Sequence, residues 1–339
     1  MAITSHRLFK KKLKTAIVTG GAGFIGSYMV DKLLNENYKV RIIDNFSGGH
    51  EKNLRHIKSN NLSVLKEDIC KLNHDNSVFK EVDVIFHFAG LGDVVPSIEK
   101  PIDYFNVNVQ GTVNLLSATK QNSIEHFIYA ASSSCYGIAS VPTKEDDPID
   151  PKYPYAMSKY LGELSVMHWR KVYKINTKSI RIFNAYGRRV RTTGAYGAVF
   201  GVFFKQKLEK KPLTIVGDGS QKRDFLHVED VAEAFFRVYS TDTKNFIFNL
   251  GAGDPKTVLE LVKLIGDEYI FIPKRPGEPD ITWADISRIK SETNWSPKIN
   301  FKDGVQDMIN NISEWKDAPL WDKDNISKAT EKWFKYLGK

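Results

Sequence analysis

A tyrosine and a lysine stand four residues apart, at Tyr155 and Lys159, and this spacing puts both side chains on one face of a helix. Ser132 follows a short apolar run that is typical of a buried strand, so we expect its hydroxyl at the same end of the molecule. A tyrosine has a pKa of about 10, and about 4 kcal/mol of preference for the phenolate brings it towards 7. A neighbouring cation such as Lys159 favours the phenolate. The three residues therefore predict a proton-transfer site with Tyr155 as the base.

A tyrosine and a lysine at this spacing are common by chance, and the plain alternative is a packed Tyr155 beside a solvated Lys159. A glycine-rich turn, Gly20-Gly-Ala-Gly-Phe-Ile-Gly26, argues against that alternative because it lies between an apolar strand and a helical pattern. Glycines let the backbone approach a pyrophosphate, and the start of a helix supplies free N–H groups. We therefore interpret this turn as a dinucleotide site. Asp44 ends the next strand, where it would bind ribose hydroxyls and repel a 2′-phosphate, so we expect NAD.

Strand and helix patterns alternate through the first half of the chain, which predicts an α/β fold with a Rossmann-type, doubly wound parallel sheet. The expected strands are residues 14–19, 39–44, 63–69, 82–88, 126–131 and 177–183, and helices are expected over 101–121 and from Pro154. Because the carboxyl ends of parallel strands share one edge, the glycine turn, Ser132 and Tyr155 are expected to meet there.

The pattern changes after Asn184, which predicts a smaller mixed α/β domain for the substrate. We expect three parts: a basic N-terminal tail (1–13), an NAD-binding domain (14–183) and a substrate domain (184–339), with residues 224–250 able to return to the sheet. Asp230 is expected to cap a helix that runs through Tyr239, and a final helix is expected over residues 326–337.

The net charge of +9 comes from scattered lysines, so it argues against a nucleic-acid-binding surface and is compatible with an anionic small substrate. Two cysteines without metal-ligand spacing predict no disulfide framework and no metal site. The chain has no apolar run of about 18 residues, and its basic N-terminus lacks the apolar region of a signal peptide. The expected location is therefore the cytoplasm, away from membranes.

These motifs resemble the extended short-chain dehydrogenase/reductases, and within them the nucleotide-sugar epimerase/dehydratase family. The resemblance runs from about Lys14 to Val305. It rests on ten segments: residues 19–26, 44–45, 68–69, 87–90, 108–112, 132–137, 155–159, 181–187, 223–228 and 275–278.

The resemblance implies a role for each matching residue. Tyr155 would take the proton of the sugar 4-hydroxyl as hydride leaves for NAD, Lys159 would hold the nicotinamide ribose, and Ser132 would bind the same hydroxyl. The implied contacts of NAD are Gly20, Gly23, Phe24, Ile25, Gly26, Asp44, Asn45, Asp68, Ile69, Ala89, Gly90, Asn108, Tyr155 and Lys159. The implied contacts of the nucleotide sugar are Ser132, Ser133, Asn184, Val199, Thr214, Val216, Arg223, Arg275, Glu278 and Thr282. Guanidinium groups suit a diphosphate because their planar forks bind its oxygens in pairs.

One departure from the family separates two activities. The family's dehydratases usually carry an acid after the serine or threonine at the strand end, and this chain has Ser133 and Ser134 there. A serine is no acid–base group near neutral pH, so the resemblance favours a 4-epimerase working through a 4-keto sugar. The alternatives are a dehydratase or dehydrogenase on the same scaffold and, more distantly, an NAD-binding sensor. A sensor would not need Ser132, Tyr155 and Lys159.

The resemblance also bears on the substrate and the assembly. Relatives often have an aromatic residue where this chain has Val216, so the base stays open, with UDP favoured. In similar 4-epimerases a tyrosine at the position of Thr282 restricts the pocket to a 2-hydroxyl, whereas Thr282 leaves room for an N-acetyl group and could donate to its carbonyl. The alternative is that Thr282 is only a β-branched strand residue. Relatives form dimers through two long helices, so a homodimer is expected.

Overall fold

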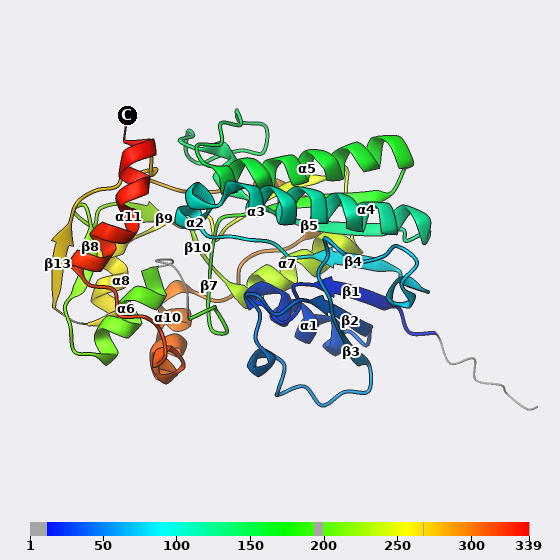
Figure 1. Cartoon of the computed structure of the whole chain (residues 1–339), viewed down its shortest axis with the longest axis horizontal. Helices are drawn as coiled ribbons and strands as arrows, with labels where there is room; N and C mark the ends of the chain where they lie inside the picture. The colour runs from blue at the N-terminus through cyan, green and yellow to red at the C-terminus, as the bar shows by residue number, and fades with distance from the viewer. Residues whose placement is uncertain (1–11, 193–198, 267, 339) are drawn as a thin grey trace, which may run out of the picture.

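The computed structural model describes residues 12–192, 199–266 and 268–338, and its centre is a seven-stranded parallel sheet (Figure 1). In spatial order the strands are β11 (Ile247–Leu250), β6 (Asn176–Ile182), β5 (His126–Ser132), β4 (Val84–His87), β1 (Thr15–Thr19), β2 (Lys39–Asp44) and β3 (Leu62–Lys66). The chain winds outwards in both directions from the β1–β4 pair, where a crevice forms at the carboxyl ends of the strands. The predicted fold class is confirmed.

Helices cover both faces of the sheet. The helices α1 (Phe24–Asn35), α7 (Val228–Ser240) and α9 (Ser287–Thr293) bury apolar side chains against one face. On the other face lie α4 (Thr112–Gln121) and the 20-residue α5 (Pro154–Tyr173), which begins at the expected proline. Full burial of β1 and β4 between these layers explains their continuous apolar runs.

The long helix expected over residues 101–121 is divided, and that prediction is wrong in part. After α2 (Val94–Glu99) come α3 (Pro101–Phe105), a π-helical turn (Asn106–Gly111) and α4. The Thr112 hydroxyl donates to the carbonyl of Asn108 at 2.7 Å, in the widened turn. Such turns concentrate at functional sites, and this one turns Asn108 towards the loop after β4.

Two further boundaries differ from the prediction. Strand β3 ends at Lys66, and α7 begins at Val228 with His227 as its N-cap, whose ring accepts from the Glu229 N–H at 3.4 Å. Asp230 lies inside the first turn, where its carboxylate accepts from the backbone of Lys298 and Ile299 at 3.0 and 2.9 Å. The expected cap was wrong because the partners of Asp230 lie almost 70 residues further along the chain.

A second core follows Asn184. It joins α6 (Val199–Leu208), α8 (Val258–Ile265) and α10 (Phe301–Asn310), and the final helix α11 (Lys323–Leu337) adds Ile326 to it. The short strands here pair as β7 (Asn184–Tyr186) with β10 (Phe225–His227), β8 (Leu213–Val216) with β13 (Tyr269–Ile272), and β9 (Lys222–Arg223) with β12 (Lys256–Thr257). Single helical turns complete the described elements: Glu51–Asn53, Ser77–Phe79, Ser133–Tyr136 and Ile312–Trp315.

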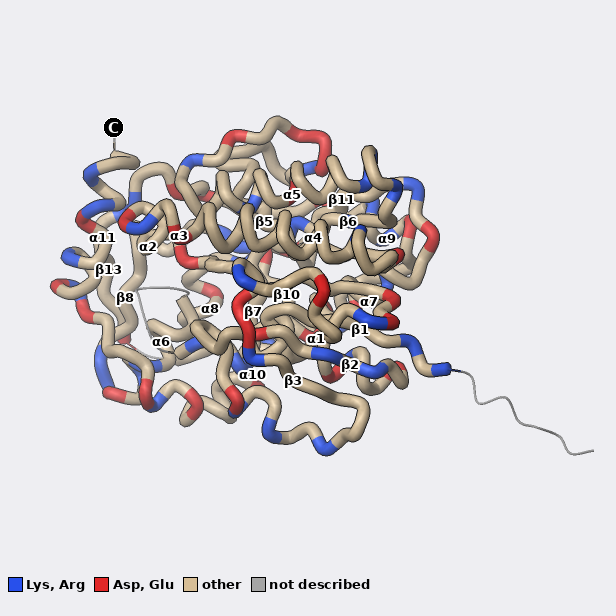
Figure 2. The backbone as a smooth tube through the Cα atoms, turned by 45° about the vertical axis from the view of Figure 1, so that its right-hand side comes forward, with Lys and Arg blue, Asp and Glu red and all other residues tan. Residues whose placement is uncertain are grey.

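Basic and acidic residues alternate over the tube in Figure 2 rather than gathering on one element. This distribution agrees with the interpretation of the net charge as a general surface property. Among residues 12–192, 199–266 and 268–338, the structure has no helix that is long and apolar enough to span a membrane. Most of the predicted N-terminal tail lies outside the described residues.

Candidate active site

A cavity of about 850 Å³ lies at the carboxyl ends of the strands, between the sheet and the second core. The loops after six neighbouring strands contribute to its wall, and so do α6, β8 and the segment 275–282. Residues that are far apart in the sequence therefore face one space, as expected for the switch point of a doubly wound sheet.

The glycine turn forms the end of the cavity next to β1. Gly20 has a φ of +67°, and a Cβ there would stand 2.7 Å from the Ala89 nitrogen. A Cβ at Gly26 would collide with the Gly20 carbonyl, so α1 can start close to β1 only with glycine there. The cradle leaves the first amides of α1 open towards the cavity wall that Gly23, Phe24 and Ile25 line. This arrangement fits a pyrophosphate.

Carboxylates lie beside this cradle at the ends of β2 and β3. Asp44 is buried, and its two oxygens accept from the backbone of Ala22 at 2.9 Å and Phe46 at 2.8 Å. Asp68 accepts from the Cys70 N–H at 2.9 Å, and Asn45 donates to it at 3.4 Å. The residues predicted around the cofactor that line the cavity here are Asp44, Asn45, Asp68, Ile69, Ala89 and Gly90. A fixed carboxylate at Asp44 suits ribose hydroxyls and disfavours a further phosphate.

Asn108 does not line the cavity, although it is predicted among the cofactor contacts. It is 1% exposed and lies behind the wall, where its Oδ1 accepts from the Leu91 N–H at 2.9 Å. Its amide nitrogen donates to the Ser158 hydroxyl, also at 2.9 Å. Asn108 therefore ties the loop after β4 to the helix that carries Tyr155.

Tyr155 is half-buried in the cavity wall next to the end of β5. Hydroxyls of Ser132 and Ser134 hydrogen-bond to its phenol and also to each other, at 2.7 Å. Burial raises the pKa of Tyr155 above 10, and the two serine hydrogen bonds oppose that effect. The lowered pKa that the motif suggests is therefore not produced by the protein groups around the phenol.

The environment of Lys159 helps to explain why the pKa of Tyr155 is raised and not lowered. Burial lowers the pKa of its ammonium to about 7, against a smaller opposing effect of Glu163. The Lys159 Nζ lies 4.3 Å from the centre of the Tyr129 ring, which can hold the charged form. A buried ion pair fixes the helix itself, because Arg181 of β6 donates to Glu163 at 3.0 Å. The sheet therefore holds Tyr155 and Lys159 in place.

The second core contributes two arginines around one carboxylate. Arg223 donates to Glu278 at 2.8 Å, and the Arg275 guanidinium lies 3.8 Å from the other oxygen of Glu278. Both arginines face the cavity, where they could bind an anionic group together. Ser133, Asn184, Val199, Thr214 and Val216 also line the cavity, as predicted for the substrate.

Thr282 lines the cavity as expected, but its hydroxyl is already used. It donates to the Asn184 side chain at 2.7 Å and lies 3.3 Å from the Asp224 N–H, which donates to it. The expected donation from Thr282 to an acetyl carbonyl therefore competes with an existing hydrogen bond. The part of that prediction that rests on the small volume of the Thr282 side chain is unaffected.

Sequence reasoning missed several residues of the wall: Ser134, Asp93, Tyr153, Arg191 and Trp333. Ser134 could have been found, because it shares the serine run of Ser132. Arg191 lies 3.5 Å from Asp93 in an ion pair that the sequence pattern does not predict. Trp333 belongs to the C-terminal helix, where Ile326, Thr330 and Trp333 form a helical stripe that indicates packing without naming its partner.

Comparisons with known proteins identify the family of this chain. Residues 17–308 match the family described as GDP-mannose 4,6-dehydratase. A putative UDP-glucose 4-epimerase from Methanocaldococcus jannaschii is 35% identical over 303 residues, which cover 87% of this chain and 97% of that relative.

Two solved structures are similar over most of the chain. The UDP-N-acetylglucosamine 4-epimerase from Methanobrevibacter ruminantium M1, in complex with UDP-N-acetylmuramic acid, has a TM-score of 0.84 at 32% identity and covers 90% of this chain and 98% of its own. The UDP-glucuronic acid 4-epimerase from Bacillus cereus, in complex with UDP-glucuronic acid and NAD, has a TM-score of 0.81 at 31% identity, with coverages of 88% and 99%. These proteins agree with the predicted enzyme class and cofactor. At this identity and coverage, the chain belongs to the extended short-chain dehydrogenase/reductases, in the family of nucleotide-sugar epimerases and dehydratases.

Proposed function

We propose that the protein is an NAD-dependent nucleotide-sugar 4-epimerase. The observation that carries the proposal is that Ser132, Tyr155 and Lys159 line the same cavity as the glycine cradle and the two arginines. The glycine cradle and Asp44 would hold NAD, whose chemistry is reversible hydride transfer with the sugar C4. The distribution of groups supports a cofactor at one end, a diphosphate at the other and the sugar between them.

The chain's own groups would handle the proton. In this proposal the Tyr155 phenolate takes the proton of the 4-hydroxyl and later gives it back, while Ser132 and Ser134 orient the phenol. Because burial opposes ionisation of Tyr155, the cationic form of Lys159 would favour the phenolate once a substrate excludes water. Arg223 and Arg275 would bind the diphosphate, and Glu278 would hold the two guanidiniums at the same place.

The polar groups next to Tyr155 favour epimerisation over elimination. Loss of a 6-hydroxyl needs an acid and a base near the sugar, and Ser133 and Ser134 supply neither. Asp93 is the carboxylate whose charge acts on Tyr155, and it is paired with Arg191. A redox-neutral epimerisation needs bound NAD and the groups that line the cavity.

For the substrate we propose a UDP-sugar, with N-acetylhexosamine accepted. The nucleotide in both solved neighbours supports UDP, and the small Thr282 supports room beside the sugar C2. We also propose that the protein works as a homodimer, which the exposed apolar residues Met157, Leu164 and Val172 of α5 support.

The test is a panel of UDP-, GDP-, dTDP- and CDP-sugars incubated with the purified protein and analysed by NMR. We expect interconversion of 4-epimers without a change in oxidation state. A 4-keto-6-deoxy product would establish a dehydratase, and a stoichiometric oxidised product with NADH would establish a dehydrogenase. The Lys159→Met variant is the matched control, and loss of conversion in it ties the product to this cavity.

A further inference from the structure

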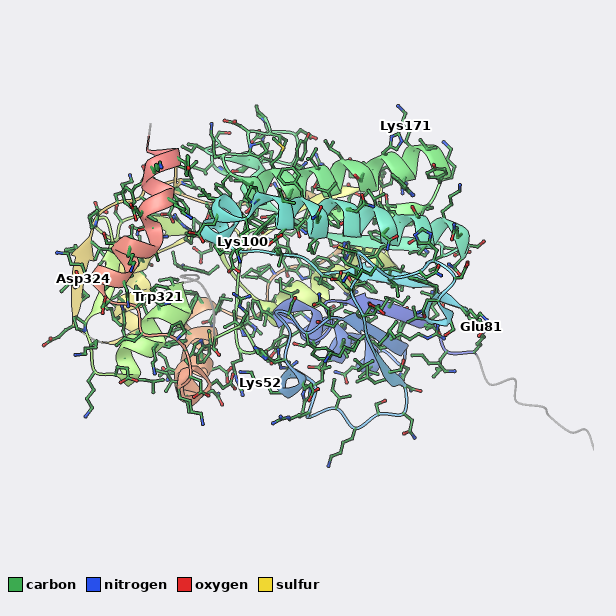
Figure 3. The ribbon with its side chains drawn as sticks, viewed as in Figure 1. Lys52, Glu81, Lys100, Lys171, Trp321 and Asp324 are labelled. Carbon is green, nitrogen blue, oxygen red and sulfur yellow. The ribbon has the colours of Figure 1, made fainter. Side chains whose placement is uncertain are left out.

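The C-terminal helix α11 reaches the cavity through one side chain. Its buried stripe begins at Ile326 in the second core and ends at Trp333, which is 5% exposed and lines the cavity. Figure 3 marks Trp321 and Asp324 where the chain enters this helix, and Figure 1 shows α11 beside α2. Lys332 pairs with Glu99 of α2 at 3.2 Å. The helix therefore runs from the second core to the loops of the sheet.

Trp333 contacts two parts of the cavity wall, the turn at Arg275 and the ring of Tyr153. Its indole N–H donates to the Pro276 carbonyl at 2.7 Å, and the Arg275 guanidinium lies 5.8 Å from its ring centre. The Tyr153 ring centre lies 6.1 Å from that of Trp333, and the Tyr153 ring stacks on the Tyr155 ring at 6.3 Å. The indole thus occupies the space between the arginine and the tyrosine pair.

We infer that Trp333 is a positioning residue for the sugar diphosphate, which it serves by holding the Arg275 guanidinium and the turn at Pro276 against the cavity. This inference rests on the proposed function, since it assumes that Arg275 binds the diphosphate. A guanidinium over an indole face is held electrostatically, and the bond from the indole N–H to Pro276 fixes the backbone one residue further on.

This role predicts that removing the Trp333 ring weakens the binding of a diphosphate more than that of a monophosphate. Without the ring, Arg275 loses the support of the indole face, so more of the ordering of its side chain falls to the bound diphosphate. We therefore expect Trp333→Ala to weaken binding of a nucleoside diphosphate about tenfold. Binding of the matching monophosphate should change by no more than about twofold, because its single phosphate needs less of the arginine pair.

The experiment is a double-mutant cycle on the NAD-loaded, full-length protein. Calorimetry gives the Kd of UDP and UMP, or of whichever nucleotide pair binds best, for wild type, Trp333→Ala, Arg275→Ala and the double variant. Trp333→Phe keeps a ring over Arg275 and should recover most of the affinity. Phe334→Ala is the control, because Phe334 is the next residue of the helix and is 39% exposed. Bound NAD and the melting temperature show that each variant is folded.

We expect Trp333→Ala to lose little further affinity in the Arg275→Ala background, and to raise KM for the nucleotide sugar more than it lowers kcat. Equal losses of Trp333→Ala in both backgrounds would overturn the inference, and so would equal losses for UDP and UMP. A wild type that binds the diphosphate in this Trp333-dependent way but epimerises no sugar would instead reject the proposed function. A wild type that converts sugars with an unaffected Trp333→Ala variant would reject only the inference.

Discussion

Tyr155 and Lys159 lie in the same wall, and desolvation disfavours the charged form of each. The protein therefore does not hold a phenolate ready. Entry of a charged or polar ligand changes the balance, because a cationic Lys159 close to the phenol stabilises the phenolate only where water is excluded.

Removing the phenol oxygen tests the proposed base. Tyr155→Phe should still bind NAD and nucleotide sugar, while kcat falls at least ~10²-fold, the usual contribution of general acid–base catalysis. Steady-state kinetics on the converted sugar measure this. Tyr160→Phe, on the same helix and outside the cavity wall, is the control. Turnover within a few-fold of wild type would exclude Tyr155 as the base.

Lys159 should leave a signature in the stability of the cofactor-free protein. Its pKa is lowered from 10.5 to about 7 in the folded state, so between these pH values the unfolded chain binds more protons. The free energy of unfolding should therefore rise with pH from about 7 to 10, and Lys159→Met should make that rise shallower. Urea unfolding at several pH values measures it. Lys171→Met, an exposed change on the same helix, should keep the wild-type slope.

The size of the side chain at position 282 should decide which sugar nucleotides are accepted. Thr282→Tyr overfills the space next to Asn184, and overpacking of about 1–3 kcal/mol corresponds to a tenfold to hundredfold loss. We expect that loss in kcat/KM for N-acetylhexosamine nucleotides relative to plain hexose nucleotides. Thr282→Ser conserves the hydroxyl and should keep the wild-type ratio. An unchanged ratio in the tyrosine variant would remove Thr282 as a determinant of the sugar.

Residues whose chemistry is local in the sequence could be predicted. Gly20, Gly26, Tyr155 and Lys159 are recognisable because their spacing relates directly to a turn or to a helix face. Trp333 could not be, since its partners Arg275 and Pro276 are brought to it only by the packing of α11. The position of Asn108 behind the wall follows from a π-helical turn, which the spacing of apolar residues in the sequence does not predict.

Among the helices, α5 has two different faces. One carries Tyr155, Lys159 and Glu163 towards the sheet, and the other leaves Met157, Leu164 and Val172 at 37%, 45% and 49% exposure. These apolar residues follow each other at intervals of seven and eight, so they form one stripe along the helix. Exposed apolar stripes of this kind mark protein contacts.

We predict that this stripe is the dimer interface. Wild type should have the mass of a homodimer at micromolar concentration in light scattering, and Leu164→Arg should yield monomers because it buries a charge in the contact. Phe271→Arg, on the exposed edge strand β13, is the control and should leave the mass unchanged. A monomeric wild type would contradict the prediction.

Elements that local sequence determines could be predicted, whereas those that depend on distant contacts could not. Strands β1, β2, β4, β5 and β6 match the predicted segments because an apolar, β-branched run is a local property. The predicted start of α7 was wrong because the Asp230 carboxylate accepts hydrogen bonds from the distant backbone of Lys298 and Ile299 and does not cap the helix. The domain boundaries at residues 13 and 183 remain a prediction.

At the scale of the whole molecule, one cavity joins the glycine cradle proposed for NAD to the side chains of Tyr155 and Lys159, which suits a reaction that begins and ends at the same oxidation state. We predict that the purified protein carries NAD and converts its substrate without added oxidant. Absorbance at 340 nm should therefore show no NADH building up in proportion to product. Asp44→Ala should release the cofactor more readily, and added NAD should then restore activity. Stoichiometric NADH would identify a dehydrogenase.

The edge strand β11 has a consequence for how the chain is made. It pairs in parallel with β6, from Ile247 against Ser179 to Leu250 against Ile182, although residues 183–246, which include α6 and α7, separate the two strands in the chain. A growing chain on the ribosome can assemble six strands of the sheet, but β6 stays an open edge until residue 250 has emerged. An unpaired, apolar edge is a template for association with other chains. Synthesis of residues 184–250 is therefore the interval in which a nascent chain of this protein depends most on chaperones.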